Sequence, residues 1–350
     1  MFNLSASSLV LFPLLLLLLS VGRTGLAGEP FLRVQPQEES ARGISVVLIS
    51  GDEEYRSEEA LPLLAQLLAC HHGLSCTVLF AIDPESGQID PNNQENIPGL
   101  KALADADLMI IATRFRNLPD EQMSLIDEYV RSGRPVIGLR TATHAFRLGE
   151  ASSFAHYTWN APVETDHPTG GGFGRWLLGE TWIAHHGAHG TQSTLGEVAP
   201  DAADHPIARG LGDQVIWGPT DVYAVRLPLP EHSQTIANGR VLDGMTPDAP
   251  AATGEKNEPM MPVAWTRELP MAVGGIRRVF TTTMGAATDL EARGTRTMLI
   301  NAVFWALGLE DEIPADGCES ELIGEYVPSA FGFGAFQRGR VPEDYDRACD

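Results

Sequence analysis

Residues 44–69 carry the sequence ISVVLISGDEEYRSEEALPLLAQLLA, and this stretch decides the fold class. Residues 44–50 are a continuous, largely β-branched apolar run, which is typical of a strand buried on both faces. Gly51 ends the run. Residues 57–69 then predict a helix, because Ser57 can cap it and two acids follow in its first turn. A buried strand that leads at once into a helix is the first half of a βαβ unit.

The same pattern recurs along the chain. In the first half, strands are predicted at residues 75–82, 107–113 and 135–139, and helices at 99–104 and 119–132. In the second half, shorter strands are predicted at 215–218, 222–227, 262–266 and 277–283, and a closing helix at 295–307. Repeated βα units of this spacing imply an α/β fold with a doubly wound, mostly parallel sheet and right-handed crossovers.

Polar side chains follow several of these strands. In a doubly wound sheet the ligand crevice lies outside the carboxyl ends of the strands. Four segments therefore border the predicted crevice, namely residues 51–55, 81–83, 113–116 and 140–144. They carry acids, arginines, threonines and a histidine, so we expect a polar ligand site.

The charge of the chain excludes some classes of partner. The 350 residues include 24 Lys and Arg against 46 Asp and Glu, for a formal net charge of -22. Nucleic acids and anionic membrane surfaces need clustered cations, so neither is expected as a partner. The hydrophobic fraction of 43% is enough for a sizeable core and excludes a wholly disordered chain.

The first 27 residues predict an export signal. Residues 9–21 are an apolar run shorter than the roughly 20 residues of a spanning helix, and Gly25-Leu26-Ala27 places small residues before a cleavage point. We expect an exported protein, periplasmic or extracellular, with no stable membrane insertion after cleavage. An uncleaved anchor is the alternative, because no Lys or Arg precedes the run. The remaining chain divides into a linker at 28–43, one α/β domain at 44–308 and an acidic tail at 309–350 packed on that domain.

Export permits disulfides. The chain has four cysteines, which allow three pairings, and the simplest expectation is the local pairs Cys70–Cys76 and Cys318–Cys349. Their spacing matches no zinc pattern.

Several ordered motifs resemble the trehalose-utilisation (ThuA-like) family of the class I glutamine amidotransferase-like superfamily, in an exported, planctomycete-type branch. They are GDEEYRSEEALPLLAQLLA at 51–69, GLRTATHAF at 138–146, DHPIARG at 204–210, PVAWTR at 262–267, TTTMGA at 281–286 and YVPSAFGFGAFQRGRVP at 326–342. The resemblance covers nearly the whole mature chain. It implies a flavodoxin-like three-layer sandwich and a small carbohydrate or polyol derivative as ligand.

The turn after the fourth strand separates the chemistries of this superfamily. Cysteine hydrolases of the superfamily carry their nucleophile at this sharp turn, where backbone N–H groups stabilise thiolate and oxyanion. Here the turn is Leu139-Arg140-Thr141-Ala142, with neither Cys nor Ser, which excludes a thiol glutaminase. Relatives often carry a His where this chain has Arg140, and a Gly-His pair where it has Gly285-Ala286. Roles of those histidines are therefore not transferred to this chain.

The candidate site residues follow from these positions. Proposed substrate-binding residues are Asp52, Arg114, Arg140, Thr141, Asp221 and Thr283. Proposed catalytic residues are His144, His186 and Glu53, since a carboxylate and a histidine in one crevice are the minimum for general acid–base work. The alternative for Glu53 and Glu54 is a structural ion network with the neighbouring arginines.

The segment His185-His186-Gly187-Ala188-His189 concentrates histidines. We expect one crevice-facing residue, His186, rather than a metal site, and no cofactor. A site built from His185, His186 and His189 is the minority alternative, because the glycines disfavour a helix and no carboxylate adjoins. Gly170–Gly174 lacks the lysine and the strand–helix context of a phosphate loop, and predicts a lid or close backbone packing instead.

Two functional hypotheses follow. The first is an exported enzyme that acts on a small carbohydrate or polyol derivative by acid–base chemistry. The second is a non-catalytic module that binds a carbohydrate or a protein on the amidotransferase-like scaffold. The sequence makes no prediction of oligomeric state.

Overall fold

A computed structural model describes residues 1, 29–163, 170–272, 274–347 and 349. The expected export signal, with its apolar run at 9–21 and its cleavage point after Ala27, lies outside these residues. Among the described residues, no helix has both the length and the apolar character needed to cross a bilayer.

The described strands form one ten-stranded sheet in the order β1-β3-β2-β4-β5-β10-β9-β8-β6-β7. Its central strands are parallel: β3 (Ser75–Leu79), β2 (Ser45–Gly51), β4 (Leu108–Thr113), β5 (Val136–Leu139) and β10 (Ile276–Thr282). In chain order this core runs 2-1-3-4-5, the order of a flavodoxin-like sheet. The expected α/β fold with a doubly wound parallel core is confirmed.

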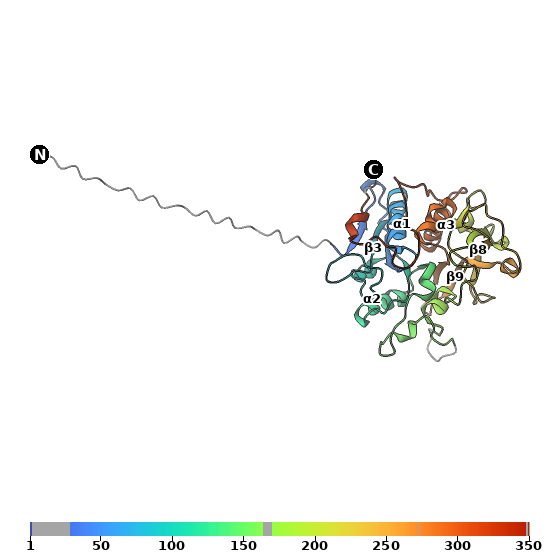
Figure 1. Cartoon of the computed structure of the whole chain (residues 1–350), viewed down its shortest axis with the longest axis horizontal. Helices are drawn as coiled ribbons and strands as arrows, with labels where there is room; N and C mark the ends of the chain where they lie inside the picture. The colour runs from blue at the N-terminus through green and yellow to red at the C-terminus, as the bar shows by residue number, and fades with distance from the viewer. Residues whose placement is uncertain (2–28, 164–169, 273, 348, 350) are drawn as a thin grey trace.

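Helices cover both faces of this core (Figure 1). The long ones are α1 (Ser57–His72), α2 (Asp120–Arg131) and α3 (Arg293–Ala306). Strand β2 is buried on both faces, and its side chains alternate between two hydrophobic clusters. Val46 and Leu48 pack in the cluster that contains α1 and α3, whereas Val47 and Ile49 pack in the cluster that contains α2. The run at 44–50 therefore contributes side chains to both hydrophobic clusters, which explains why apolar and polar residues do not alternate along it.

The second half of the chain extends the sheet with antiparallel strands: β9 (Met261–Pro270), β8 (Ser233–Leu242), β6 (Ser193–Val198) and β7 (Ile216–Gly218). The sequence did not predict β6 or β8, since both mix polar and half-buried residues. The predicted strand at 222–227 is wrong. Only Tyr223 pairs there, in an isolated bridge with His185.

The expected linker at 28–43 is also partly wrong. Its residues Phe31–Val34 form β1, which pairs antiparallel with β3 and covers that edge of the sheet. Short helical turns complete the described chain: η1 (Glu38–Ser40), η2 (Leu100–Asp105), η3 (Arg140–His144), η4 (Ala155–Tyr157), η5 (Gly174–Leu178), η6 (Pro200–Ala202), η7 (Pro206–Ala208), η8 (Glu255–Asn257), η9 (Ala287–Glu291), η10 (Glu310–Glu312) and η11 (Pro342–Tyr345).

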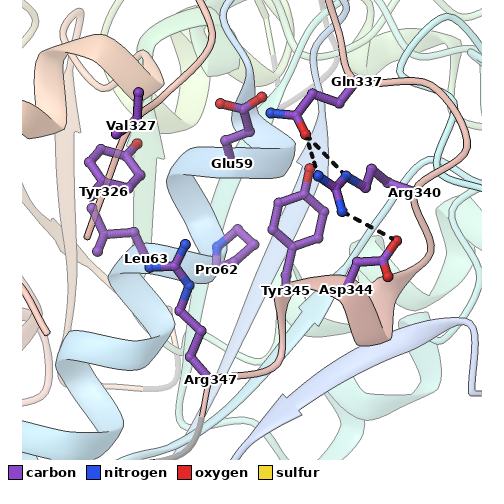
Figure 2. A pocket seen from close by; sticks show the side chains of 10 residues that line it. All are labelled: Glu59, Pro62, Leu63, Tyr326, Val327, Gln337, Arg340, Asp344, Tyr345 and Arg347. Carbon is purple, nitrogen blue, oxygen red and sulfur yellow. Dashed lines mark hydrogen bonds and ion pairs between the residues drawn. The ribbon is translucent and has the colours of Figure 1, made fainter. Parts of the chain in front are cut away.

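The C-terminal tail runs back over α1. Figure 2 shows Tyr326, Tyr345 and Arg347 of the tail around Pro62 and Leu63 of that helix, at the edge of a cavity between the two segments. The tail is thus built against the outer face of the helix that follows the first core strand.

One disulfide fixes this arrangement and corrects the expected local pairing. Cys70, in the last turn of α1, is bonded to Cys349 in the tail, with 5.1 Å between their Cα atoms. Cys76 and Cys318 are free and buried. The pairing Cys70–Cys76 fails because β3 directs Cys76 into the core beneath α1, whereas Cys70 is half-buried and meets the tail.

We predict that Cys70→Ser lowers the free energy of unfolding by about 2–5 kcal/mol, because the bond closes a very long loop and limits the unfolded chain. Denaturant unfolding with and without reductant measures this change. Reductant should destabilise the native protein and leave Cys70→Ser unaffected. Peptide mapping that links Cys70 to Cys76 would contradict the assignment.

Candidate functional site

The carboxyl ends of β2, β4 and β5 meet at one edge of the sheet, and strained backbone marks this edge. Arg56, Phe115 and Arg140 have φ values of 59°, 50° and 44°, in the left-handed region that side chains other than glycine rarely adopt. Such conformations cost free energy and concentrate at functional sites, where the surrounding structure enforces them. The edge predicted from the sequence therefore carries the structural signs of a built site.

Arg140 lies at the sharp turn after β5, and its side chain is 2% exposed. Its guanidinium donates to the Asp221 carbonyl (2.8 Å), the Thr283 carbonyl (2.6 Å) and the Asp221 carboxylate (Oδ1, 3.0 Å). The same group lies between two aromatic rings, 4.4 Å from the centroid of Tyr55 and 3.9 Å from that of Tyr223. Ring faces attract a cation, so the two rings stabilise the Arg140 guanidinium in addition to its hydrogen bonds.

This burial corrects the predicted role of Arg140 as a direct ligand contact. With its terminal nitrogens bonded to protein and almost no exposed surface, the guanidinium positions Asp221 instead. Burial also raises the pKa of the Tyr55 hydroxyl to about 12, against the opposing effect of the Arg140 charge.

Three other predicted substrate-binding residues are buried to the same extent. The Asp52 carboxylate accepts from the backbone N–H groups of Glu54 and Tyr55 and from the Thr141 hydroxyl. Asp52, Thr141 and Thr283 are each 2% exposed or less. Direct contact with a ligand does not agree with this burial. Asp52 and Thr141 instead tie the turn after β2 to the turn after β5.

The Asp221 carboxylate forms hydrogen bonds with two histidines at the crevice. Its Oδ2 lies 2.7 Å from Nδ1 of His185, and its Oδ1 lies 3.1 Å from Nδ1 of His189. Both imidazoles are a little over one-third exposed, whereas the carboxylate is buried. Hydrogen bonds from the two histidines and the charge of Arg140 outweigh burial and lower the pKa of Asp221 to about 2. The carboxylate is therefore ionised at neutral pH.

The expectation that His186 faces the crevice is wrong. Its Nε2 bonds to the Lys256 carbonyl at 2.7 Å, outside the cluster. Gly187 allows the loop to pass close to the carboxylate, because a Cβ at that position would lie 3.2 Å from the Asp221 Cβ. The loop therefore presents His185 and His189, which flank the segment His186-Gly187-Ala188.

A small cavity opens beside these histidines, with a volume of about 30 Å³, enough for roughly two water molecules. It is lined by Glu54, Arg114, Phe115, His144, Trp182, His185 and Tyr223. Burial raises the pKa of the Glu54 carboxyl, although Arg114 opposes the effect. The cavity thus brings a carboxyl group, a guanidinium, imidazoles and aromatic rings together in one small polar space.

Glu53, a predicted catalytic residue, is held by two arginines. Arg114 and Arg116 each form an ion pair with one of its carboxylate oxygens. This is the structural ion network considered as the alternative for the acids after β2. Glu54 differs, since its side chain reaches the cavity, pairs with Arg114 at 3.2 Å and lies 3.5 Å from His189.

His144, the other predicted catalytic histidine, lines the cavity from η3 but is 3% exposed. Its ring lies 4.8 Å from Phe115 and 5.6 Å from Trp182, between centroids. Burial lowers its pKa well below the usual value, and the charge of Arg114 adds to the effect. A neutral imidazole here can hydrogen-bond to a ligand hydroxyl, but it is a poor proton acceptor at neutral pH.

Among the described residues, His185, His189 and Asp221 could hold a metal ion, since one ligand atom from each lies within 4.8 Å of the others. Two imidazoles and a carboxylate suit divalent first-row metals. This set contains Asp221 in place of His186, unlike the set of three histidines considered from the sequence. The Arg140 guanidinium already binds the same carboxylate, and its charge opposes a second cation.

Sequence reasoning gave too little weight to His185, His189 and Glu54, and did not identify Tyr55 and Tyr223 as the rings that enclose Arg140. The available signal was the pair of histidines four residues apart with a glycine between them. The glycine-rich segment 170–174 serves close packing, because a Cβ on Gly172 would lie 2.0 Å from the Thr158 carbonyl oxygen.

Known families and solved structures include proteins similar to this chain. The family model ThuA, described as trehalose utilisation, matches residues 46–306. No curated protein matches the sequence. One similar solved structure is a ThuA-like protein from Bacteroides uniformis ATCC 8492, with 14% identity, a TM-score of 0.42 and coverage of 76% of this chain and 92% of that chain. Another, from Parabacteroides merdae ATCC 43184, has 15% identity, a TM-score of 0.46 and coverage of 87% and 99%.

We predict that Asp221→Asn lowers the free energy of unfolding at pH 7 by about 2 kcal/mol or more, because it removes an ionised carboxylate that stabilises the fold. A depressed pKa contributes stability that is fully present above about pH 4 and is lost as the pH falls towards 2. The difference between native protein and variant should therefore shrink over that interval in denaturant titrations. The exposed Asp213→Asn is the control, and a difference that does not change with pH would contradict the assignment.

Proposed function

The chain belongs to the ThuA (trehalose utilisation) family, and on that premise we propose that its crevice binds a small carbohydrate derivative and acts on it by acid–base chemistry, without a cysteine nucleophile. The observation that carries the proposal is the pairing of the buried Asp221 carboxylate with His185 at the cavity wall. A carboxylate that accepts from one ring nitrogen fixes the tautomer and leaves the other nitrogen free to take a proton.

In this mechanism Nδ1 of His185 carries the hydrogen that Asp221 accepts, so Nε2 is the unprotonated atom. Nε2 removes a proton from a sugar hydroxyl or from a carbon beside a carbonyl, and the ionised Asp221 stabilises the imidazolium that forms. Arg140 is a positioning residue, because it holds Asp221 and lies too deep to meet the ligand.

Glu54 supplies the complementary group. Burial raises the pKa of its carboxyl group and so favours the protonated form, which can return a proton to the ligand. Arg114, beside it, can donate to a ligand oxygen, and the buried imidazole of His144 can hydrogen-bond to a hydroxyl. Trp182 provides an aromatic ring that suits the C–H face of a sugar, whereas Arg114 and Arg147 already lie over the Phe115 ring.

The described cysteines offer no alternative nucleophile. Cys70 and Cys349 are bonded to each other, and burial raises the pKa of the Cys318 thiol to about 12 and that of Cys76 further still. Neither free thiol lines the crevice. This arrangement supports a mechanism of proton transfer rather than covalent catalysis by sulfur.

We also propose that the protein is exported to the periplasm or beyond the cell. The support is the apolar N-terminal run with its small-residue cleavage pattern, together with the Cys70–Cys349 bond, since disulfides persist mainly in oxidising compartments.

The second candidate function is a carbohydrate-binding module without turnover. One observation favours it: the buried side chain of Arg140 occupies the sharp turn after β5, so this turn offers no reactive group to the crevice. The two functions differ in whether a bound sugar is converted.

We predict that His185→Ala lowers kcat by about 10²–10⁴-fold on a converted sugar, because the proton acceptor is lost, while sugar binding is largely kept. Trehalose and its monosaccharide derivatives are the probes, with binding followed by calorimetry and conversion by NMR. His186→Ala is the matched control and should behave as the native protein.

Equal losses in both histidine variants would contradict this assignment. Binding without conversion by the native protein would select the binding module instead. Absence of both binding and conversion for all the probes would remove the carbohydrate proposal.

A further inference from the structure

The tail segment Tyr326–Gly334, here called the arm, comes from outside the family match and ends at the crevice. Two hydrogen bonds join it to the region around the start of α1: the Ser329 N–H donates to the Glu59 carboxylate at 2.6 Å, and the Gly332 N–H donates to the Glu54 carbonyl at 2.7 Å. The fully buried Arg56 donates in turn to the Gly332 carbonyl. The arm is therefore attached to the same turn that supplies Glu54 to the cavity.

Phe331 extends the aromatic packing around the Asp221 cluster. Its ring stacks on Tyr55, with 5.7 Å between centroids, and lies 5.4 Å from the ring of His189. Tyr55 is the ring beneath Arg140, so Phe331, Tyr55 and Arg140 form a continuous stack. This contact places the arm beside a histidine whose Nδ1 lies 3.1 Å from the Asp221 carboxylate.

Phe333 lies further out on the arm, at the rim of the crevice. The Arg114 guanidinium lies 5.0 Å from its ring centroid, and Arg114 lines the cavity. The Phe333 side chain is nevertheless 63% exposed. An aromatic ring left in water beside a polar cavity, and fixed there by a cation, has the arrangement of a ligand-stacking surface.

The backbone between the two rings explains how both reach the crevice. Gly332 has φ 131°, a conformation that residues with a Cβ rarely adopt, and no atom lies within 4 Å of the position that its Cβ would take. The glycine therefore serves the turn rather than close packing. It lets Phe331 pack inwards on Tyr55 while Phe333 stays over Arg114.

We infer that the arm is a wall of the ligand site, with Phe333 as a direct stacking contact and Phe331 as a positioning residue behind His189. This inference rests on the proposed carbohydrate function and refines its substrate class. A cyclic sugar presents a C–H face to Phe333 and hydroxyls to Arg114 and Glu54, whereas an acyclic polyol has no such face. The site thus selects pyranose-type ligands over linear polyols, and the Cys70–Cys349 bond holds the tail that carries the arm.

The test compares Phe333→Ala with Phe336→Ala, a substitution of the same kind in the same tail that lies by the 83–92 loop instead of the crevice. Calorimetry measures binding of trehalose and methyl glucoside as cyclic probes and sorbitol as the linear one. Phe333→Ala should weaken binding of the cyclic probes by about 2–10-fold, the worth of one aromatic stack, without lowering Tm. Phe336→Ala should leave the binding of the cyclic probes unchanged. Unchanged cyclic binding in Phe333→Ala, or an equal loss for sorbitol, overturns the inference.

A second measurement tests the wall even if no sugar binds, an outcome that by itself removes only the proposed function. Diethyl pyrocarbonate modifies exposed histidines, and mass spectrometry resolves the modified sites. Phe331→Ala should speed modification of His189 several-fold relative to the native protein and to Phe336→Ala, because the ring no longer covers the imidazole. An unchanged rate at His189 shows that the arm is not a wall and overturns the inference.

Discussion

The buried ion pair between Arg140 and Asp221 is the interaction on which the site depends. Arg140 occupies the sharp turn after β5, where its left-handed backbone aims the side chain beneath the crevice. A buried guanidinium without partners would cost several kcal/mol, so the structure surrounds it with two carbonyls, a carboxylate and two aromatic rings. Removing either partner would leave an uncompensated charge. The pair therefore fixes Asp221, and Asp221 fixes the two histidines.

The same constraint leaves the sharp turn after β5 without a nucleophile at the crevice, because the turn directs the Arg140 cation inwards. The reactive groups that we propose, His185 and Glu54, line the cavity instead. The fold supplies the location of the crevice, whereas the loop at 185–189 and the turn after β2 supply these proposed groups.

The fold was largely predictable because the apolar runs of β2, β4 and β5 are continuous and their helices carry clear start and stop signals. Strands β6 and β8 were not, since their half-polar pattern depends on pairing with distant strands. Segments 51–55, 113–116 and 140–144 line the cavity as the strand order predicted, whereas segment 81–83 does not. The depth of burial was not predictable, since Asp52 and Thr141 follow their strands as expected and still face inwards. Whether His185 or His186 reached the crevice depended on how the loop pairs with Val222, a contact that sequence spacing does not encode. The predicted disulfide pairing was wrong for a similar reason. Cys70 and Cys349 are 279 residues apart, and only the fold brings them together.

The central claim is that Asp221 holds His185 with Nδ1 protonated and Nε2 free to take a proton from a sugar. Nitrogen NMR of the His185 ring, assigned by comparison with His185→Ala and recorded with and without trehalose, tests it most directly. The account predicts that the neutral ring carries its hydrogen on Nδ1 rather than Nε2, and that the Nε2 resonance shifts when the sugar is added. A ring protonated only at Nε2, or resonances that do not respond to any sugar that binds, would contradict it.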